Sequence, residues 1–545
     1  MSEDKKWWHK AVIYQIYPRS FSDSNNNGIG DLRGIINRLD YLKDLGIDAI
    51  WFSPFYPSPQ EDFGYDITDF GAVNPEYGTM NDFDELLVRT HKLGIKVILD
   101  MILNHSSDKH PWFLESKKDK TNPKHDWYIW SDGVGRKKNK PPNNWHSIIG
   151  GSAWEWCDER QQFYLHQFLK CQPDLNWWNP DVQETMFNYI RFWLDKGIDG
   201  YRLDIIHTLF EDKELRNNPF SKQFFPNDAT SEKQFQKPVY TQFLPETIDV
   251  CIKLREIIDV YSPERVLIGE AVENLKIIRP LYGTSNNGLN MVFNFHLGAQ
   301  PFTAKKIQSA ILNTEKEVAD PLWPCYALSN HDFVRMISRH KNDIEKSKIM
   351  IMFLLTLRGT PVVYYGEEIG MPQVKIPLKK QLDPIAHHVV WGIPVGLFFA
   401  RDGCRTPMQW NNSQINAGFS VDSNVKPWLP IAPNSVAINV ENQYKDQNSL
   451  LNYFKKLITI RKKYKSLHEG SLKIVSNLNT KYISYEREFK NEKICVIVNM
   501  TKKKQTVSLP YKKATQLLST HSDKTKEFFE NIQLLPYEGV IIKSE

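Results

Sequence analysis

Several features are scarce in this sequence of 545 residues, and each absence argues against a class of protein. No apolar run is long enough to cross a bilayer, and residues 1–8 lack the apolar core of a secretion signal. Neither sign of charge dominates, with 69 Lys and Arg against 64 Asp and Glu, so nucleic-acid binding has no support. No internal repeat or low-complexity tract stands out. We therefore expect a globular, cytoplasmic protein without a membrane or nucleic-acid partner.

Cysteine is also sparse. The six cysteines, at positions 157, 171, 251, 325, 404 and 495, show neither CxxC spacing nor the density of a disulfide framework. They indicate ordinary thiols in a reducing compartment. Tryptophan, by contrast, is abundant at 16 residues, which suits either an aromatic core or a protein that stacks rings on a flat ligand.

Short apolar runs alternate with segments of helical periodicity, such as residues 32–45, 83–93 and 182–196. This alternation is typical of a parallel α/β architecture. Eight expected strands cover residues 12–17, 47–52, 96–103, 198–206, 265–271, 291–295, 326–329 and 361–365. Eight strand-plus-helix units predict a (β/α)8 TIM barrel, whose active site lies at the carboxyl ends of the strands.

Two parts of the chain fall outside this alternation. Residues 105–173 are rich in Trp, Asn, Lys and Gly and are too long for a simple loop, which predicts a subdomain B inserted after strand 3. Short alternating strands then predict a C-terminal antiparallel β-sandwich domain. We expect these strands at residues 481–487, 494–499, 505–509 and 539–542. The expected domains are a barrel at 1–104 and 174–468, the insertion at 105–173 and the β domain at 469–545.

Residues 200–207, with the sequence GYRLDIIH, carry two charges on a strand that is otherwise apolar. Arg202 and Asp204 are two residues apart, so period-2 geometry points both side chains to one face. Buried charges are costly unless they are paired. The stretch alone fits a structural ion pair and a functional site about equally well.

Other strand ends decide between these interpretations. Strand 3 ends near Asp100 and His105, strand 5 ends on Glu270, and strand 7 is followed by His331 and Asp332. Several carboxylates and two histidines at one rim are hard to explain by packing. Glycosidic bond cleavage needs such a set, with one carboxylate as nucleophile and one carboxylic acid that protonates the leaving oxygen. A nearby cation is expected to keep the nucleophile ionised.

These segments resemble the conserved regions of glycoside hydrolase family 13, the α-amylase family. Three further stretches resemble its α-glucosidase and oligo-1,6-glucosidase branch, namely YQIYPRSF at 14–21, QPDLNW at 172–177 and RDGCRTPMQW at 401–410. The resemblance covers nearly the whole chain. It implies a retaining mechanism with Asp204 as nucleophile, Glu270 as acid/base and Asp332 as transition-state stabiliser.

The same resemblance implies a set of substrate-binding residues. His105, Arg202, His331 and Arg401 match positions that hold the glucose in subsite −1. Asp62 and Tyr65, in the segment DFGYD, match residues that grip the terminal glucose. An acidic acceptor and an aromatic ring suit sugar hydroxyls and an apolar sugar face. Phe168 matches an aromatic residue on the aglycone side, where position 149 carries Ile instead of the Phe of many relatives.

Residues 23–31, DSNNNGIGD, place oxygen ligands at alternate positions and Gly at the sixth, as calcium loops do. The candidate ligands are Asp23, Asn25, Asn27, the carbonyl of Ile29 and Asp31. An Asx-rich turn without metal is the alternative. Because related α-glucosidases often bind Ca²⁺ or Mg²⁺ here, we expect a structural ion and no organic cofactor.

The expected protein is a retaining exo-α-glucosidase, monomeric or weakly oligomeric, that acts on short α-glucosides such as maltose-like oligosaccharides or sucrose. Oligo-1,6-glucosidase, sucrose hydrolase or isomerase and trehalose-6-phosphate hydrolase are alternatives. Ile205 follows the nucleophile, where Val tends to accompany α-1,6 cleavage and Thr or Ala α-1,4 cleavage, so linkage stays open. Residues 366–400 are expected to wall off the aglycone side. A non-enzymatic module like a transporter heavy chain predicts a membrane span and eroded carboxylates, and the sequence shows neither.

Overall fold

A closed barrel of eight parallel strands forms the centre of the molecule, with the strand order β1-β11-β10-β9-β8-β7-β3-β2. The computed structural model describes residues 6–224, 231–387, 400–478, 480–509, 511–522 and 525–544. The strands are β1 Ile13–Ile16, β2 Ala49–Phe52, β3 Lys96–Ile102, β7 Gly200–Asp204, β8 Val266–Gly269, β9 Met291–Asn294, β10 Cys325–Ala327 and β11 Thr360–Tyr364. The predicted (β/α)8 barrel is confirmed.

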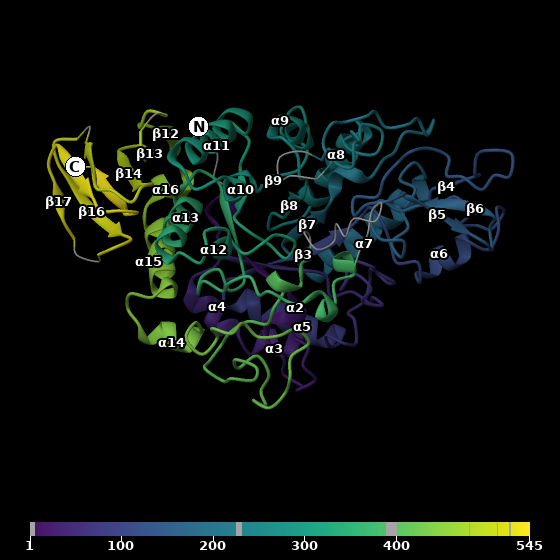
Figure 1. Cartoon of the computed structure of the whole chain (residues 1–545), viewed down its shortest axis with the longest axis horizontal. Helices are drawn as coiled ribbons and strands as arrows, with labels where there is room; N and C mark the ends of the chain where they lie inside the picture. The colour runs from purple at the N-terminus through teal and green to yellow at the C-terminus, as the bar shows by residue number, and fades with distance from the viewer. Residues whose placement is uncertain are drawn as a thin grey trace.

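Helices surround this barrel in Figure 1, which explains why its strands are buried on both faces and consist mainly of apolar residues. The long ones are α5 Met80–Lys92, α7 Pro180–Lys196, α8 Glu246–Asp259, α11 Ala304–Glu317, α13 Ile344–Thr356 and α15 Leu450–Lys463. Their ends carry the expected signals. Thr79 and Asp82 form a capping box before α5, and Gly197 ends α7 in a left-handed conformation with φ of 106°.

The single helix predicted for residues 32–45 is wrong, because the chain forms α3 Leu32–Ile36 and α4 Leu39–Leu45 instead. Between them, Arg38 leaves the helical conformation, with φ of −110° and ψ of 6°. Its guanidinium lies 4.2 Å from the centre of the Trp410 ring and donates to the carbonyl of Gly418 at 3.1 Å. A tertiary contact outweighs local helix propensity here.

Between β3 and α7 the chain builds a small sheet of order β4-β6-β5, at the blue end of the molecule in Figure 1. Its strands are β4 Trp130–Ser131, β5 Trp154–Cys157 and β6 Gln162–Leu165, and the short helix α6 Pro111–Ser116 precedes them. A separate cluster of buried side chains supports the sheet, with Trp145 stacked on Trp154 at 5.8 Å. The insertion expected after strand 3 is therefore present.

The C-terminal part contains the predicted antiparallel strands, at the yellow end of Figure 1. The six-stranded sheet comprises β12 Ser471–Ile474, β13 Tyr482–Phe489, β14 Glu492–Asn499, β19 Gly539–Ser544, β16 Ala514–Ser519 and β17 Glu527–Phe528. A second sheet pairs β15 Gln505–Ser508 with β18 Asn531–Leu534. Buried Arg487 joins this part to the barrel helices by donating to the carbonyls of Thr356 and Leu467.

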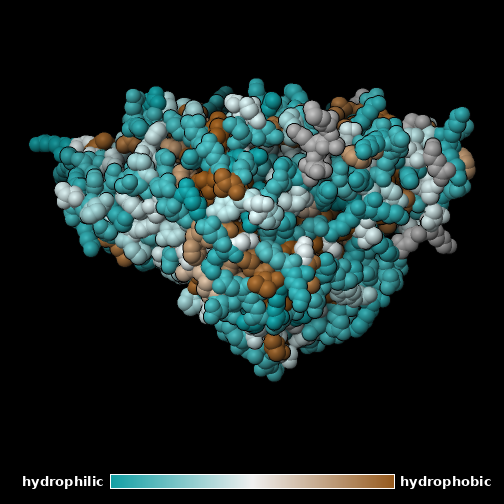
Figure 2. All heavy atoms as spheres, turned by 180° about the vertical axis from the view of Figure 1, so that it is seen from behind, coloured by the Kyte–Doolittle hydropathy of each residue, from teal (hydrophilic) through white to brown (hydrophobic). Residues whose placement is uncertain are grey.

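The surface in Figure 2 is mostly hydrophilic, and its hydrophobic patches are small and scattered. None of the helices in the described part of the chain combines the length and the apolar composition that crossing a bilayer requires.

Candidate active site

Three carboxylates converge on one buried arginine at the carboxyl ends of the barrel strands. Arg202 of β7 is fully buried, and its Nη1 lies 2.7 Å from Asp100 Oδ1 and 2.6 Å from Asp204 Oδ1. Its Nη2 forms an ion pair with Glu270, the residue directly after β8. Asp204 and Glu270, which are far apart in sequence, therefore share one guanidinium. The ion pair that the sequence suggests between Arg202 and Asp204 is therefore present, and it belongs to a cluster of three carboxylates.

The shared guanidinium changes the expected electrostatics of Asp204. Burial raises the pKa of Asp204 well above its usual range, and the carboxylates of Glu270 and Asp100 raise it further against the lowering effect of Arg202. Burial likewise raises the pKa of Asp100 to about 6. Burial and the two neighbouring carboxylates therefore oppose the effect of Arg202 on Asp204, because one cation serves three carboxylates.

The strand that carries Asp204 is shorter than predicted. It ends at Asp204, and Ile205 adopts a left-handed conformation with φ of 34° and ψ of 41°. This conformation is strained for a β-branched residue. It starts a 3-10 turn in which Thr208 N donates to the carbonyl of Ile205 at 3.0 Å. The turn brings the backbone amide of Ile205 to 3.4 Å from Glu270 Oε2. The strained residue therefore follows Asp204 in the chain and lies next to Glu270 in space.

Asp332 faces this group from the loop after β10. Its Oδ1 lies 3.0 Å from Arg405 Nη2 and 3.3 Å from Arg401 Nη1, and its Oδ2 lies 3.1 Å from His331 Nε2. Burial alone would raise the pKa of Asp332, but His331 and the two guanidiniums outweigh it and hold that pKa below its usual range. The pKa of Asp332 is therefore shifted in the opposite direction to that of Asp204.

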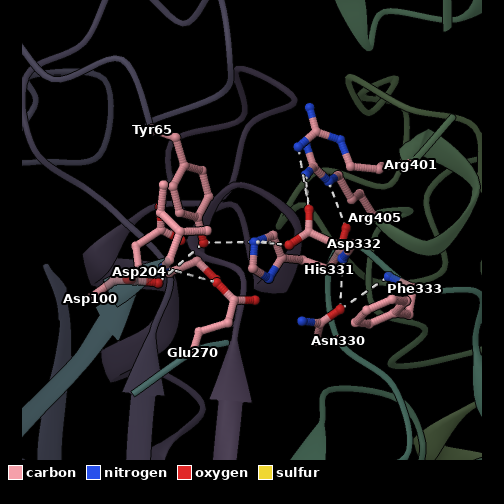
Figure 3. Close-up of polar contacts among 12 residues, drawn as sticks. Tyr65, Asp100, Asp204, Glu270, Asn330, His331, Asp332, Phe333, Arg401 and Arg405 are labelled. Carbon is pink, nitrogen blue, oxygen red and sulfur yellow. Dashed lines mark hydrogen bonds and ion pairs between the residues drawn. The ribbon is translucent and has the colours of Figure 1, made fainter. Parts of the chain in front are cut away.

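His331 is held as a neutral ring. Its Nδ1 lies 2.8 Å from the side-chain nitrogen Nε2 of Gln15. Because this nitrogen can only donate, Nδ1 accepts and the ring proton resides on Nε2 of His331. Nε2 lies 2.6 Å from the hydroxyl of Tyr65, whose ring stacks on the imidazole at 5.2 Å (Figure 3). Burial lowers the pKa of His331 well below its usual value.

A second network of polar contacts lies in the wall of the site. Arg401 Nη2 lies 2.6 Å from Asp62 Oδ1, and Gln172 Nε2 donates to Asp62 Oδ2 at 3.0 Å. The same Gln172 nitrogen lies 3.2 Å from Nε2 of His105, a buried ring whose pKa burial lowers to about 3. His105 is therefore neutral and can exchange hydrogen bonds with sugar hydroxyls.

A cavity of about 290 Å³ joins the two networks. The sequence-predicted residues in its wall are Asp62, Tyr65, His105, Phe168, Asp204, Glu270, His331, Asp332 and Arg401. Arg202 lies behind them, buried. Ile149 and Phe333 also line the cavity, and their apolar side chains contrast with the polar end at Asp62. The arrangement can bind one polyol unit and present two carboxyl groups to it.

Sequence reasoning missed Asp383, in the loop after β11. Its carboxylate accepts from Arg401 Nε at 3.0 Å and lies 2.9 Å from Arg401 Nη2, and the guanidinium lowers the pKa of Asp383 to about 2. Asp383 thus holds Arg401 in the direction of Asp62. No local motif signals this role, because Asp383 and Arg401 are 18 positions apart and the residues between them carry no pattern of their own. Residues 388–399 of the predicted aglycone wall lie outside the described residues.

The candidate metal loop is compact and rich in oxygen ligands. The carboxylates of Asp23 and Asp31 are buried, whereas the carboxamides of Asn25 and Asn27 lie at the surface. Asp23 Oδ1 accepts from the amide of Asn26 at 2.8 Å, and Asn27 Oδ1 accepts from that of Ile29, also at 2.8 Å. In the described part of the chain, no group of three or more His, Cys, Asp or Glu side chains could hold a metal. With two carboxylates and neutral oxygens only, this loop fits a hard cation such as Ca²⁺ in donor chemistry.

We expect removal of the ion by a chelator to lower the stability of the protein and to leave its turnover almost unchanged. If an ion is held by Asp23, Asn25, Asn27, Ile29 O and Asp31, EDTA should lower the melting temperature, because an ion bound only by the folded state stabilises it. Turnover measured on still-folded enzyme should change little, because the loop contributes no residue to the cavity wall. Calorimetry and initial rates with and without EDTA check this, and added Ca²⁺ is the control. An unchanged melting temperature favours the plain Asx turn.

Comparison with known proteins agrees with this geometry. Residues 15–470 match the family model of the alpha amylase catalytic domain, and residues 483–541 match that of the alpha-amylase SusG C-terminal domain. The chain is 38% identical over 574 residues to an oligo-1,6-glucosidase of Parageobacillus thermoglucosidasius, covering 99% of each chain. It is 38% identical over 528 residues to a probable alpha-glucosidase of Rhizobium meliloti, covering 95% of this chain and 93% of the relative. A solved structure of the alpha-glucosyl transfer enzyme XgtA superposes with a TM-score of 0.91 at 37% identity, over 99% of this chain and 100% of that one.

Proposed function

Because this chain belongs to the α-amylase family of glycoside hydrolases, in the branch of the α-glucosidases and oligo-1,6-glucosidases, we propose that it is a retaining exo-α-glucosidase. It removes the non-reducing terminal glucose from short α-glucosides. The observation that supports exo-action is the ion pair at 2.6 Å between Asp62 and Arg401 in the cavity wall, which we propose closes one end of the cavity. A glucan chain cannot extend past this pair.

In the proposed mechanism, Asp204 attacks the anomeric carbon of the bound glucose while Glu270 protonates the glycosidic oxygen. The aglycone leaves with that proton, and a β-glucosyl ester forms on Asp204. Glu270, now a carboxylate, then takes a proton from a water molecule that attacks the anomeric carbon and releases α-glucose. Such a pair needs a separation of about 5–5.5 Å between the carboxyl groups, which suits two residues on one guanidinium.

The remaining side chains hold the glucose while it distorts. Asp332 is the anion opposite Asp204, and its low pKa keeps it charged for the sugar hydroxyls that it is proposed to bind. Neutral His105 and His331 offer ring N–H groups to hydroxyls of the same sugar. Hydrogen bonds of this kind favour hydrolysis when they strengthen in the transition state.

Initial rates of glucose release test the proposal, measured side by side on maltose, isomaltose, sucrose, trehalose and trehalose 6-phosphate. We expect release of glucose from at least one neutral disaccharide. Strained Ile205, which lines the cavity beside the nucleophile, is expected to discriminate between the linkages. If none of these substrates yields glucose, the proposed function is wrong.

We expect the acidic limb of kcat/KM to lie above pH 4, about where an unperturbed aspartic acid titrates. The nucleophile must be ionised, and both burial and the neighbouring carboxylates raise the pKa of Asp204. A group with a raised pKa loses its charge at a higher pH, so activity should fall while ordinary aspartates are still charged. A pH profile of kcat/KM on maltose, with folding checked by circular dichroism at each pH, measures this. Full activity down to pH 4 contradicts it.

A second candidate activity is transfer of the glucosyl group to an alcohol. The apolar wall of Ile148, Ile149 and Phe333 supports it, because such a wall favours an apolar acceptor over water. The similarity to the alpha-glucosyl transfer enzyme points the same way. Chromatography of the products formed from maltose with added butanol distinguishes transfer from hydrolysis. Butyl glucoside in excess of free glucose supports transfer, and glucose alone supports hydrolysis.

A further inference from the structure

A lysine lies in the wall of the cavity near the proposed acid. Lys233, in the long connection between β7 and α8, is only 8% exposed and lines the cavity together with Phe224 and Gln234. Burial and, to a smaller extent, the charge of Lys233 lower the pKa of His207 to about 3, while the side chain of His207 interacts with the backbone of Glu270. Because Glu270 protonates the leaving oxygen in the proposed mechanism, this link through His207 leads us to expect Lys233 on the side where the aglycone departs.

The position of Lys233 is fixed by the surrounding backbone. The next two residues, Gln234 and Phe235, adopt left-handed conformations with φ of 48° and 61°. The Gln234 amide donates to the carbonyl of Phe224 at 2.7 Å, and its side-chain oxygen accepts from the amide of Gly151 at 3.2 Å. The last hydrogen bond joins this connection to the inserted subdomain, which contains Gly151. Contacts from both segments therefore fix the position of Lys233 in the cavity wall.

Lys233 differs from Arg401, the other cation in the cavity wall, in having no carboxylate partner among the residues that the structure describes. Arg401 forms ion pairs with Asp62, Asp332 and Asp383. Within the described residues, by contrast, no carboxylate oxygen lies within ion-pair distance of the Lys233 ammonium, and burial alone lowers its pKa to about 7. An ammonium in an apolar pocket is costly without a counter-charge. A ligand that supplies an anion would remove this cost.

We propose that Lys233 forms an aglycone subsite for a negatively charged group, a phosphate monoester or a carboxylate, on the leaving part of the α-glucoside. This inference rests on the proposed function, since it requires a leaving group beside Glu270. The ring of Phe224 contacts the apolar face of the aglycone, and the lysine binds the anion. Substrates of this kind are therefore preferred over neutral analogues of the same shape.

Two matched pairs of substrates test the subsite. The first is 4-carboxyphenyl and 4-carbamoylphenyl α-glucoside, which differ in charge and hardly in shape. The second is trehalose 6-phosphate and trehalose. We expect kcat/KM to favour the charged member of at least one pair, and the pair that responds distinguishes phosphate from carboxylate. Equal or higher kcat/KM for the neutral member of both pairs overturns the proposal.

Variants of Lys233 test whether this lysine causes the preference for charged substrates. Lys233→Gln should lower the charged-to-neutral ratio of kcat/KM by at least tenfold, because a hydrogen-bonded charge is lost. Lys233→Arg should retain a preference for the charged member. Lys237→Gln is the matched control, because Lys237 is exposed on the same connection and lies 3.8 Å from Glu232. If Lys233→Gln changes kcat/KM for the charged and the neutral member by the same factor, the lysine is only structural and the proposal is wrong.

Binding to an inactive enzyme separates this inference from the proposed function. Calorimetric titration of Asp204→Asn with the two phenyl glucosides measures affinity without turnover. Tighter binding of the carboxylate, lost in Asp204→Asn/Lys233→Gln, supports the subsite even if no substrate is hydrolysed. Trehalose 6-phosphate and trehalose are titrated in the same way, and equal affinity for the charged and neutral members of both pairs overturns the subsite and leaves the glucosidase proposal standing.

Discussion

Replacing Asp204 with Asn should lower kcat on maltose by a factor of about 10⁴ or more, the scale of loss when an enzyme loses its nucleophile. Asn keeps the shape of the side chain but cannot form the glucosyl ester. The fold should persist, because Arg202 retains its ion pairs with Asp100 and Glu270. Steady-state kinetics at saturating maltose measure the loss.

Stability and rescue serve as controls for this variant. A carboxyl group with a raised pKa in the folded state destabilises that state at neutral pH, so Asp204→Asn should unfold at the same or a higher temperature. In the truncated variant Asp204→Ala, sodium azide should restore turnover of an activated glucoside such as 4-nitrophenyl α-glucoside and yield β-glucosyl azide, because azide can attack from the space that the missing carboxylate leaves. A variant that keeps a tenth of the wild-type kcat would show that another group is the nucleophile.

The second large effect concerns the closed end of the cavity. Asp62→Ala should lower kcat/KM on maltose by about 10- to 150-fold, which corresponds to a hydrogen bond to a charged acceptor of about 1.5–3 kcal/mol. If that bond tightens as the sugar ring distorts, kcat falls as well. The truncation also removes one of the anions that hold Arg401, while Asp383 still positions it. Kinetics on maltose and on longer maltodextrins measure both effects.

Chain length distinguishes the pocket from an open cleft. Wild-type activity should fall steeply from disaccharides to long maltodextrins and be negligible on starch, because Asp62 and Arg401 block further glucose units. Asp40→Ala, at an exposed position of α4, is the control and should leave this dependence as it is. Rapid loss of iodine staining before glucose appears would show internal cleavage and an open cleft.

Much of the barrel could be predicted from the sequence, because buried parallel strands form uninterrupted apolar runs that turn signals separate. The convergence of Asp100, Arg202 and Glu270 could be predicted in the same way, since polar residues at strand ends must meet at one rim of a barrel. The break at Arg38 and the left-handed turn at Ile205 could not. Both depend on contacts with residues distant in sequence, which a local pattern does not contain.

The electrostatics of the site could not be predicted from the sequence either. Pairing Arg202 with Asp204 alone implies a low pKa for that carboxyl, whereas the structure adds two further carboxylates to the same guanidinium. Asp383 and Lys233 escaped notice for a similar reason. Their roles depend on where long connections fold back over the cavity, and no spacing rule describes those connections.

Anomer-resolved NMR of the first product tests the central claim most directly. If Asp204 is the nucleophile and Glu270 the acid/base of a retaining pair, two inversions occur at the anomeric carbon. The spectrum recorded in the first minutes of maltose hydrolysis should then show glucose released from the non-reducing end as the α-anomer, before mutarotation produces the β-anomer. Initial release of β-glucose would mean a single inversion and would contradict the mechanism.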